Sequence, residues 1–510
     1  MHDKPAAQPE AAPVETAEPR TPGFSQAFID FIPTGWAPYP GLPPRLPAAD
    51  HTQPRRDAVS AAFPGERLVI PAGGLKVRSN DTDFRFRAHS AFAHLTGLGS
   101  DREPDAVLVL EPTFTGQPSE LTASGHAATL YFKPRAPRTD REFYADARYG
   151  EMWVGHRDSL DEMTARTGLD CRPIGELTQA LASGSDRIGA RIVRDADEQL
   201  TRLLDQMRRA GGPVETDALE ASDRELERML SELRLIKDDF ELAEMQRACD
   251  ATAAGFAAVA ADLPTAVAQG RGERWCEGVF ALHARHLGND VGYGSICASG
   301  DHANTLHWIR NDGDLHDGDL ILLDMGVELD SLYTADVTRT LPVSGTFTEP
   351  QRRVYDAVLA AQNAGIAAAR AGATFHAVHD AAIRVIAEHL HAWGLLPVSV
   401  EESLDPARGG QHRRWMVHGT SHHLGIDVHD CAQARNEFYR QGTLRPGMCI
   451  TVEPGLYFRS TDLLVPEELR GIGVRIEDDI VITDGDPVIL SAALPREADA
   501  VQAWMAGLRG

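Results

Sequence analysis

The sequence predicts a two-domain protein in which an α/β domain is followed by an α+β domain. At 510 residues, the chain is long enough for two or three domains. Short apolar runs alternate with helical patterns from about residue 55 to 235, which is typical of an α/β domain. Beyond residue 235, longer helical segments separate the strand-like runs, and acidic residues stand inside several of those runs. This change in the spacing of helical and strand-like segments indicates a second domain with a different architecture.

The composition is that of an ordinary globular protein, with 43% hydrophobic and 25% charged residues. A formal net charge of −25 argues against a nucleic-acid partner, because proteins that bind phosphate backbones carry a basic face. The N-terminus has no apolar core of a signal peptide, and no window approaches 18 consecutive apolar residues. The six cysteines lack CxxC spacing and fit reduced thiols. We therefore expect a cytoplasmic protein without a membrane partner.

The chain begins with a Pro-rich extension, residues 1–50, whose first 23 residues are rich in Ala, Pro and Glu. Such a composition predicts partial disorder. The stretch FIPTGWAPYPGLPP adds aromatic side chains to this arm, which suggests that it packs onto another surface, a partner subunit being one candidate.

The first folded domain is predicted over residues 51–235. Its strands are expected in the runs RLVIPAG from 67, DAVLVLEP from 105, ATLYFKP from 128 and RIGARIV from 187. Helical patterns follow: Ser222 with Glu225 and Asp238 with Glu241 both have capping-box spacing. We place the boundary between these two helices, near residue 235.

The second domain is predicted over residues 236–510. Its strands are expected at 319–326 (DLILLDMG), 448–455 (MCITVEPG) and 474–482 (VRIEDDIVI). Between them, Thr348 and Gln351 fit a further capping box with Pro350 in the first turn, and FHAVHDAAIRVIAEHLHAWG predicts a later helix.

Acidic residues inside these apolar strands are the first functional signal. Asp324 follows four aliphatic residues, Asp336 lies on the next strand-like segment, and Glu453 and Glu477 stand in the later strands. Burying an unpaired carboxylate costs several kcal/mol. These acids therefore need either cationic partners, such as Arg339 and Arg475, or metal ions.

A histidine-rich segment is the second signal. HGTSHHLGIDVHD, residues 418–430, holds four histidines and two aspartates among glycines and aliphatic residues. Two Asp, two Glu and one His form an oxygen-rich donor set, which suits two divalent ions, Mn²⁺ or Co²⁺ before Zn²⁺, bridged by carboxylates.

The segments LLDMG, TADVTRT, HGTSHHLGIDVHD, TVEPGLYF and GVRIEDDIVIT together closely resemble the pita-bread metallopeptidases, and within them the aminopeptidase P family. The resemblance runs from about residue 55 to 500. It implies an N-terminal domain like that of creatinase and prolidase, in which FRFRAHSAFAHLTGL matches a recurrent stretch. It also implies a pita-bread catalytic domain.

The resemblance assigns five side chains to two metal ions. Asp324 would bind one ion, Asp336 and Glu477 would bridge both, and His422 and Glu453 would complete the shell of the second. Mn²⁺ is expected first, with Co²⁺ or Zn²⁺ as alternatives.

It assigns catalytic roles as well. Glu453 would also act as general base. His307 and His429 would face the substrate, His418 would be a further active-site histidine, and Arg475 would support the site. His423 is expected to be structural.

The proline pocket is less defined by sequence. Tyr457 and Trp308 are candidate walls, with core packing as the alternative for each. In some relatives an aromatic from a neighbouring subunit completes the pocket, but Ala93 and His94 stand where this sequence would need one. A homo-oligomer, dimer or tetramer, is expected from the family.

The predicted function is release of the N-terminal residue from peptides with proline in the second position, by metal-activated water. Prolidase, which cleaves Xaa-Pro dipeptides, is the alternative with the same metals and would need a cation for the substrate carboxylate. Methionine aminopeptidase fits less well because it has no use for the N-terminal domain. A non-catalytic binding protein on the same scaffold would be marked by lost ligands, and none is lost.

Overall fold

The N-terminal half of the chain folds around a five-stranded mixed sheet. The computed structural model describes residues 23–115, 122–210 and 214–508, so that residues 1–22 of the predicted extension lie outside the described residues. The sheet has the order β6-β5-β4-β1-β7, in which β1 pairs with β7 and β5 with β6 in parallel, and the other pairs are antiparallel. All four strands predicted in this domain are confirmed. The strands are β1 (Arg67–Pro71), β4 (Val107–Thr115), β5 (Thr122–Phe132), β6 (Asp170–Pro173) and β7 (Ala190–Ile192).

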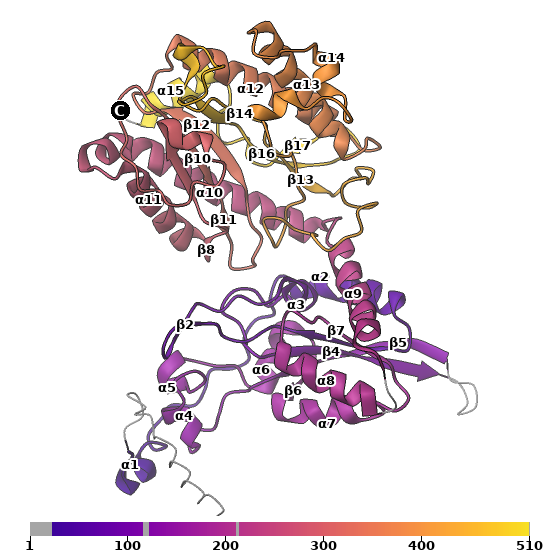
Figure 1. Cartoon of the computed structure of the whole chain (residues 1–510). Coiled ribbons are helices and arrows are strands. Elements are labelled where there is room, and N and C mark those ends of the chain that lie inside the picture. Colours follow the sequence, from indigo (N-terminus) through magenta and orange to yellow (C-terminus); the bar gives the residue numbers. More distant parts are fainter. Residues whose placement is uncertain (1–22, 116–121, 211–213, 509–510) are drawn as a thin grey trace, which may run out of the picture.

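Helices cover both faces of this sheet (Figure 1). Side chains alternate across a strand: Leu68 and Ile70 of β1 join a core with α2, α3 and α9, whereas Val69 joins the opposite core with α7 and α8. The helices are α2 (Ala49–Ala62), α3 (Ser90–Thr96), α6 (Leu160–Thr167), α7 (Leu177–Ala182), α8 (Glu198–Ala210) and α9 (Thr216–Leu233). Shorter elements are α1 (Gln26–Phe31), α4 (Arg141–Ala145), α5 (Glu151–Val154), β2 (Val77–Ser79), β3 (Thr82–Asp83) and the 3₁₀ turn η1 (Ile174–Glu176).

The described part of the N-terminal arm packs on its own domain. The Phe24 and Phe28 rings contact Tyr144 edge-on, and the Trp36 ring contacts Phe143. Contact of this arm with a partner subunit stays a prediction.

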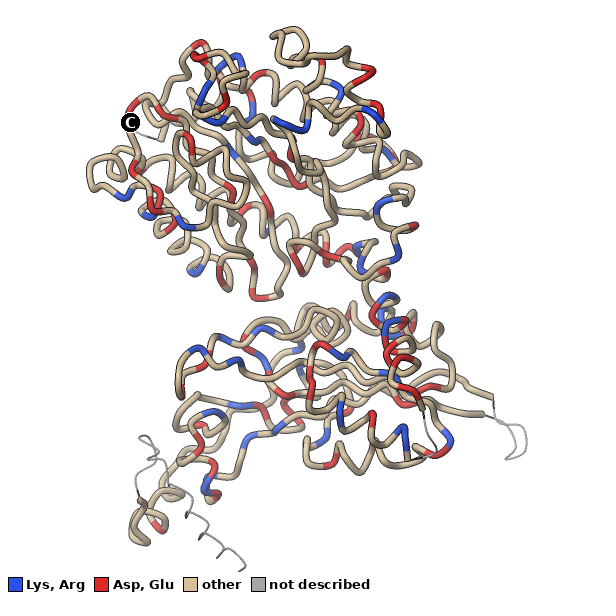
Figure 2. The backbone as a smooth tube through the Cα atoms, viewed as in Figure 1, with Lys and Arg blue, Asp and Glu red and all other residues tan. Residues whose placement is uncertain are grey.

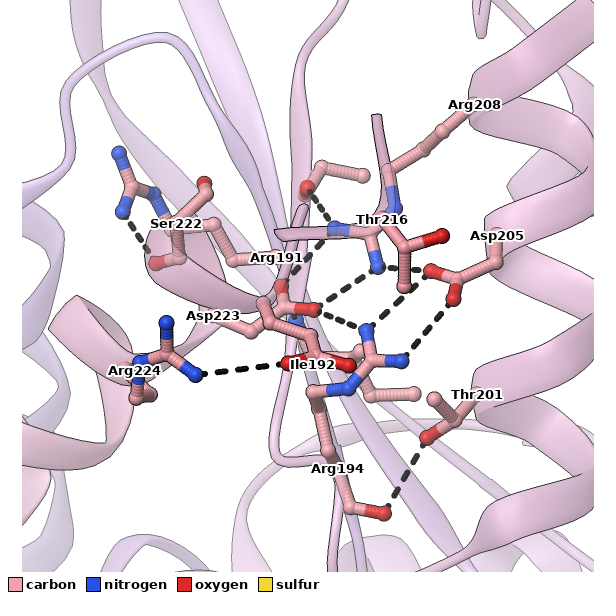
Figure 3. Close-up of polar contacts among 12 residues, drawn as sticks. Arg191, Ile192, Arg194, Thr201, Asp205, Arg208, Thr216, Ser222, Asp223 and Arg224 are labelled. Carbon is pink, nitrogen blue, oxygen red and sulfur yellow. Dashed lines mark hydrogen bonds and ion pairs between the residues drawn. The ribbon is translucent and has the colours of Figure 1, made fainter. Parts of the chain in front are cut away.

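Helix α9 begins earlier than the sequence predicts. It starts at Thr216, so Ser222 lies in its second turn and the predicted capping box there is wrong. Asp223, next to Ser222 inside this helix, bonds to other elements of the domain. Its fully buried carboxylate accepts hydrogen bonds from the backbone of Ile192 and from the guanidinium groups of Arg194 and Arg208 (Figure 3). Asp223 thereby ties α9 to β7 and α8.

The C-terminal half is built from antiparallel sheets surrounded by long helices (Figure 1). The sheets have the orders β12-β10-β9, β13-β16-β17, β14-β15 and β11-β8. The strands are β8 (Asp290–Val291), β9 (Ile296–Ser299), β10 (Leu320–Met325), β11 (Val327–Glu328), β12 (Val337–Pro342), β13 (Cys449–Val452), β14 (Gly455–Tyr457), β15 (Gly473–Arg475), β16 (Asp478–Val481) and β17 (Val488–Ile489). The helices are α10 (Asp239–Gln269), α11 (Gly272–Leu287), α12 (Glu349–Ala368), α13 (His376–Ala392), α14 (Val400–Leu404) and α15 (Ala498–Leu508), with 3₁₀ turns η2 (Gly300–Asn304), η3 (Gln411–Arg414) and η4 (Glu467–Leu469).

The capping boxes at Asp238 and Thr348 are both confirmed as the N-termini of α10 and α12. The run predicted as one strand at 474–482 is instead two strands, β15 and β16. Between them the backbone N–H of Ile476 donates to Pro454 and that of Glu477 donates to Thr338. The chain therefore changes its pairing partner from β14 to β13 at the position of Glu477.

Within the described residues, α10 has the length and composition of a membrane-spanning helix. Its apolar side chains Met245, Phe256 and Leu263 are fully buried in the core of the C-terminal domain, and Phe240, Leu242 and Val267 pack against that core while partly buried. The helix contacts α11, α15, β11 and β12. Burial against these elements accounts for its apolar composition.

Charged groups fill the junction between the two domains, and acidic and basic residues alternate along α9 as it reaches this junction (Figure 2). Arg55 of α2 donates to Asp238 at 2.7 Å and lies 3.6 Å from Glu241. The buried His94 ring lies 3.3 Å from the Glu241 carboxylate. Although burial alone would raise the pKa of Glu241, the charges of His94 and Arg55 hold that pKa far below its usual value.

A second group of contacts joins the segment before α3 to the C-terminal domain. Arg87 donates to the Glu328 carboxylate at 2.6 Å and to the backbone carbonyl of Ile426 at 2.8 Å. The Ser90 hydroxyl donates to Asp427 at 2.6 Å. The N-terminal domain therefore holds the histidine-rich segment directly.

Replacement of Asp223 by alanine is expected to lower the free energy of unfolding of the N-terminal domain by about 3–5 kcal/mol, because two buried guanidinium groups and one backbone N–H lose their shared acceptor. Urea unfolding followed by circular dichroism measures this effect. Glu220→Ala, on the same helix and half exposed, is the control and should change stability by only a few tenths of a kcal/mol. Equal effects of the two changes would contradict the role given to Asp223.

Candidate metal centre

One cavity of about 870 Å³ in the C-terminal domain is lined by every residue that the sequence predicts as a metal ligand or catalytic group. The residues come from separate strands and loops that the fold brings to a single place. They are Asp324, Asp336, His422, Glu453 and Glu477 of the predicted metal set, and His307, His418, His429 and Arg475 of the predicted catalytic set.

Two of the carboxylates meet because a glycine lets two segments approach. Asp324 lies in β10 and Asp336 directly precedes β12, its antiparallel neighbour. A Cβ at Gly326 would overlap the carbonyl oxygen of Ala335, so only glycine allows this approach. The Tyr293 hydroxyl lies 2.8 Å from Asp324 and 2.5 Å from Asp336. With one proton, it donates to only one carboxylate at a time.

His422 and Glu453 are neighbours across a short ladder. The backbone N–H groups of Thr451 and Glu453 donate to the carbonyls of His422 and Thr420, which aligns the histidine-rich segment with β13. Nδ1 of His422 lies 3.2 Å from the His423 carbonyl and carries the proton that it donates there. Nε2 is therefore the free ligand atom, 3.3 Å from Asp336 and 3.7 Å from Glu453. This hydrogen bond fixes the tautomer that a metal ligand needs.

Arg475 lies in the cavity wall, and each of its three side-chain nitrogens donates a hydrogen bond. Nη2 donates to Asp324 at 2.5 Å, Nη1 to the Tyr457 hydroxyl at 3.1 Å and Nε to the Thr338 hydroxyl at 3.2 Å. Thr338 in turn donates to Glu477 at 2.7 Å. One guanidinium thus positions two of the carboxylates, one directly and one through a threonine.

His418 is held as a neutral imidazole. The Tyr457 hydroxyl accepts from Arg475 and so donates to Nε2 of His418 at 2.7 Å, while Nδ1 donates to the Gly419 carbonyl at 2.6 Å. Burial and the nearby charge of Arg475 lower the pKa of His418 to about 3.

His307 and His429 lie exposed on the cavity wall. The ring of His429 meets that of His422 edge to face, with centroids 4.6 Å apart. Burial and the charge of His422 lower the pKa of His429. His429 is therefore an uncharged imidazole at neutral pH that can donate or accept a hydrogen bond.

The carboxylates carry more negative charge than the protein neutralises. Burial raises the pKa of Glu453 to about 7, raises that of Glu477 well above its usual value and raises that of Asp324. Burial alone would also raise the pKa of Asp336 and lower that of His422, but their mutual contact reverses both shifts, and the pKa of His422 reaches about 9. Arg475 and His422 are the cations that face this group of four acids.

The donor set fits divalent ions. Ligand atoms of Asp336, His422 and Glu477 lie within 4.8 Å of one another. Asp324 and Glu453 flank this group, Asp324 through the shared Tyr293 hydroxyl and Glu453 beside His422. Carboxylate oxygens with one imidazole are ligands that hard or borderline divalent cations prefer.

For Tyr457 and Trp308, the structure supports core packing, the alternative to a place in the pocket wall. Neither Tyr457 nor Trp308 lines the cavity; Tyr457 bonds to His418, and the Trp308 indole donates to Glu273. Ile296, Leu306 and Val428 supply the apolar wall instead. Ala93 and His94 are buried at the domain junction, so their stretch cannot face a neighbouring subunit.

Sequence reasoning missed three polar residues of the site. Tyr293 and Thr338 bond to the carboxylates, and Arg440 lines the cavity. Tyr293 precedes β9 in GYGSICAS, where a lone tyrosine between glycines was the available signal.

Comparisons with known proteins agree with this geometry. Residues 243–484 match Metallopeptidase family M24, and residues 52–188 match the aminopeptidase P N-terminal domain. The chain is 50% identical over 508 residues to Xaa-Pro aminopeptidase 1 of Streptomyces coelicolor, covering 98% of this chain and 97% of that protein. The chain belongs to the Xaa-Pro aminopeptidases of family M24.

Solved structures of this family have the same architecture. An aminopeptidase from Pseudomonas aeruginosa superposes with a TM-score of 0.76 at 29% identity, covering 91% of this chain and 99% of the other. Escherichia coli aminopeptidase P in complex with substrate gives 0.74 at 29% identity, with 90% and 99% covered. The predicted two-domain fold and the predicted metallopeptidase class are confirmed. Membership of M24 also implies a dinuclear centre of divalent metal ions.

Metal affinity is expected to rise with pH between pH 6 and 8. The pKa of His422, raised to about 9, and that of Glu453, raised to about 7, leave both groups protonated at pH 6, and a metal ion must displace those protons. Calorimetric titration of the metal-free protein with Mn²⁺ in two buffers of different ionisation enthalpy should show about one proton more released per chain at pH 6 than at pH 8, because Glu453 is protonated only at the lower pH. Binding without proton release would contradict these pKa directions.

Proposed function

We propose that this protein releases the N-terminal residue from peptides whose second residue is proline. The observation that carries the proposal is the convergence of four buried acids and four imidazoles on one cavity that is large enough for a short peptide. The identity to a curated Xaa-Pro aminopeptidase over nearly the whole chain supports the substrate class.

We assign the metal positions by residue. Asp324 would hold one ion, Asp336 and Glu477 would be shared by both ions, and His422 and Glu453 would complete the ligand set of the second ion. Manganese is proposed as the native metal ahead of Co²⁺ or Zn²⁺, because oxygen donors outnumber nitrogen donors in the set. When bound, two divalent ions supply positive charge that lowers the pKa of a water between them and polarises the peptide carbonyl.

The side chains then move the protons. Glu453 accepts the proton of the attacking water, whose oxygen bonds to the carbonyl carbon of the first residue. An imidazole N–H of His429 donates to the carbonyl oxygen as negative charge develops there. The proton passes from Glu453 to the proline nitrogen, the C–N bond breaks, and a free amino acid leaves a peptide that begins with proline.

The remaining residues orient the substrate. The carboxylate of Asp324, fixed by Arg475, faces the cavity where the free α-amino group would lie, which accounts for exopeptidase action. His307 lies over the substrate from the opposite wall. The neutral imidazole of His418 lines the cavity 3.7 Å from the Glu453 carboxylate.

Prolidase activity is the second candidate, because Arg440 offers the cation that it requires. This residue lines the cavity and could pair with the carboxylate of an Xaa-Pro dipeptide. The same guanidinium could equally bind the end of a tripeptide, so the preferred length decides between the two activities.

Hydrolysis of Xaa-Pro-Yaa tripeptides is expected to exceed that of Xaa-Pro dipeptides with Mn²⁺ present and to cease with chelator. Release of the first amino acid, measured by chromatography, reports both rates. Glu453→Gln should lower kcat by 10²–10⁴-fold, the usual contribution of a general base. Faster cleavage of dipeptides would make the protein a prolidase, and chelator-resistant cleavage would contradict the metal mechanism.

We further propose that the protein is a cytoplasmic homo-oligomer, dimer or tetramer. All six cysteines are buried and unpaired, as expected in a reducing compartment. Exposed apolar side chains at Phe31, Trp36 and Trp153 gather on the arm and α5, which offers a contact surface. Light scattering should give a mass of at least two chains, and Phe31→Ser with Trp36→Ser should reduce it. A monomeric mass for the unchanged protein would overturn this assembly.

A further inference from the structure

The loop that carries His307 has no regular structure of its own. After η2 ends at Asn304, the chain runs without a helix or strand until β10 begins at Leu320. Within the described part of the protein, the His307 imidazole makes no hydrogen bond. Its place on the cavity wall therefore depends on what holds the neighbouring residues.

One buried carboxylate accepts four hydrogen bonds, two from this loop and two from the chain just before it. Glu273, in the first turn of α11, has no exposed surface. Its Oε1 accepts the backbone N–H of Ser299 at 2.8 Å and a proton from Nδ1 of His302 at 2.7 Å. Its Oε2 accepts the Trp308 indole N–H at 2.8 Å and the backbone N–H of Gly313 at 2.7 Å. The four donors lie on both sides of His307 in the sequence.

Packing around this carboxylate is close. The His302 and Trp308 rings are stacked with centroids 3.9 Å apart, so the two side chains that bond to Glu273 also hold each other. A Cβ at Gly313 would lie 2.8 Å from the Glu273 carboxyl group and from the His302 ring. Glycine at this position is what allows the loop backbone to approach the acid.

Only a carboxylate satisfies all four donors. Glu273 has two acceptor oxygens with two lone pairs each, whereas an amide of the same shape has one oxygen and an NH₂ group that donates. Glutamine would therefore turn two buried N–H groups toward another donor. No arginine or lysine pairs with Glu273 among the described residues, and His302, at 2.7 Å, is the titratable side chain among its four donors.

We propose that Glu273 is a positioning residue for His307, which holds the loop of residues 299–313 so that the imidazole stays over the substrate cavity. Trp308, the neighbour of His307, transmits this constraint most directly. This inference rests on the proposed function, because that function gives His307 its contact with the substrate. It adds a residue outside the cavity, on a different helix, whose effect on the reaction passes through that histidine.

The first experiment tests whether Glu273 holds the loop in place, and it requires no measurement of enzymatic activity. In Glu273→Gln, hydrogen exchange measured by mass spectrometry should be at least 10-fold faster across residues 299–313 and unchanged across 418–430. Glu277→Gln, the same chemical change one turn further along α11, is the matched control and should leave both segments unchanged. Unchanged exchange in Glu273→Gln would overturn the proposal even if the protein proved inactive on every peptide.

The link to His307 is tested by a double-mutant cycle on Xaa-Pro-Yaa tripeptides. Glu273→Gln should lower kcat/KM by about 10²-fold, as misplacement of a group by about 1 Å does, with bound metal per chain unchanged. In the His307→Ala background, the same change should cost less than threefold. Equal losses in the two backgrounds would mean that Glu273 acts on the fold in general, and would overturn the proposal.

Trp308→Phe covers the case in which Glu273→Gln fails to fold. It keeps the aromatic stack on His302 and removes only the indole N–H. We expect a three- to tenfold loss of kcat/KM that disappears in the His307→Ala background, and a loss that persists there would count against the proposal. Absence of tripeptide hydrolysis by the unchanged protein would instead refute the proposed function and leave the exchange result to decide the anchoring.

Discussion

The crowding of four carboxylates in a buried cavity is the constraint around which the C-terminal domain is organised. Asp324, Asp336, Glu453 and Glu477 lie where their charges are poorly screened by water. Arg475 and His422 offset only part of this charge. Without further cations the site relaxes by taking up protons, as the raised pKa values of Glu453 and Glu477 indicate. The fold holds together a group of acids that is stable in its ionised form only when metal is bound.

The strands supply the rigidity that such a site requires. Each acid lies in a strand or within one residue of a strand end, and backbone pairing joins β10 to β12 and β13 to β16. The break between β15 and β16 also contributes to the rigidity of the site. At Glu477 the chain leaves one sheet for another, and the exchange of backbone partners orients the carboxylate toward the cavity.

Sequence patterns predicted the part of this arrangement that is local. An acid after a run of aliphatic residues indicates a buried carboxylate, which identified Asp324, and capping-box spacing located the starts of α10 and α12. The same spacing failed at Ser222, because α9 already begins at Thr216, and the adjacent Asp223 serves a long-range network that no local pattern reveals.

Contacts between distant segments could not be predicted for the same reason. Tyr293 and Glu273 act through partners that lie up to 43 residues away in the sequence, and neither stands in a distinctive motif. For Trp308, the sequence suggested a place at the site that the structure does not show. Its position beside His307 suggested a pocket wall, whereas only the fold reveals that its indole turns inward. Residue type and spacing identify metal ligands well, but they do not identify the residues that hold those ligands in place.

The bonds from Arg87 and Ser90 to the segment of residues 426–427 give the N-terminal domain a part in turnover. Every predicted metal ligand lies in the C-terminal domain, so a fragment cut between α9 and α10 would retain the full set of acids. It would lose the support beneath the strand-free segment that ends in His429. The acids that would bind metal and the contacts that support the histidine-rich segment thus lie on different domains.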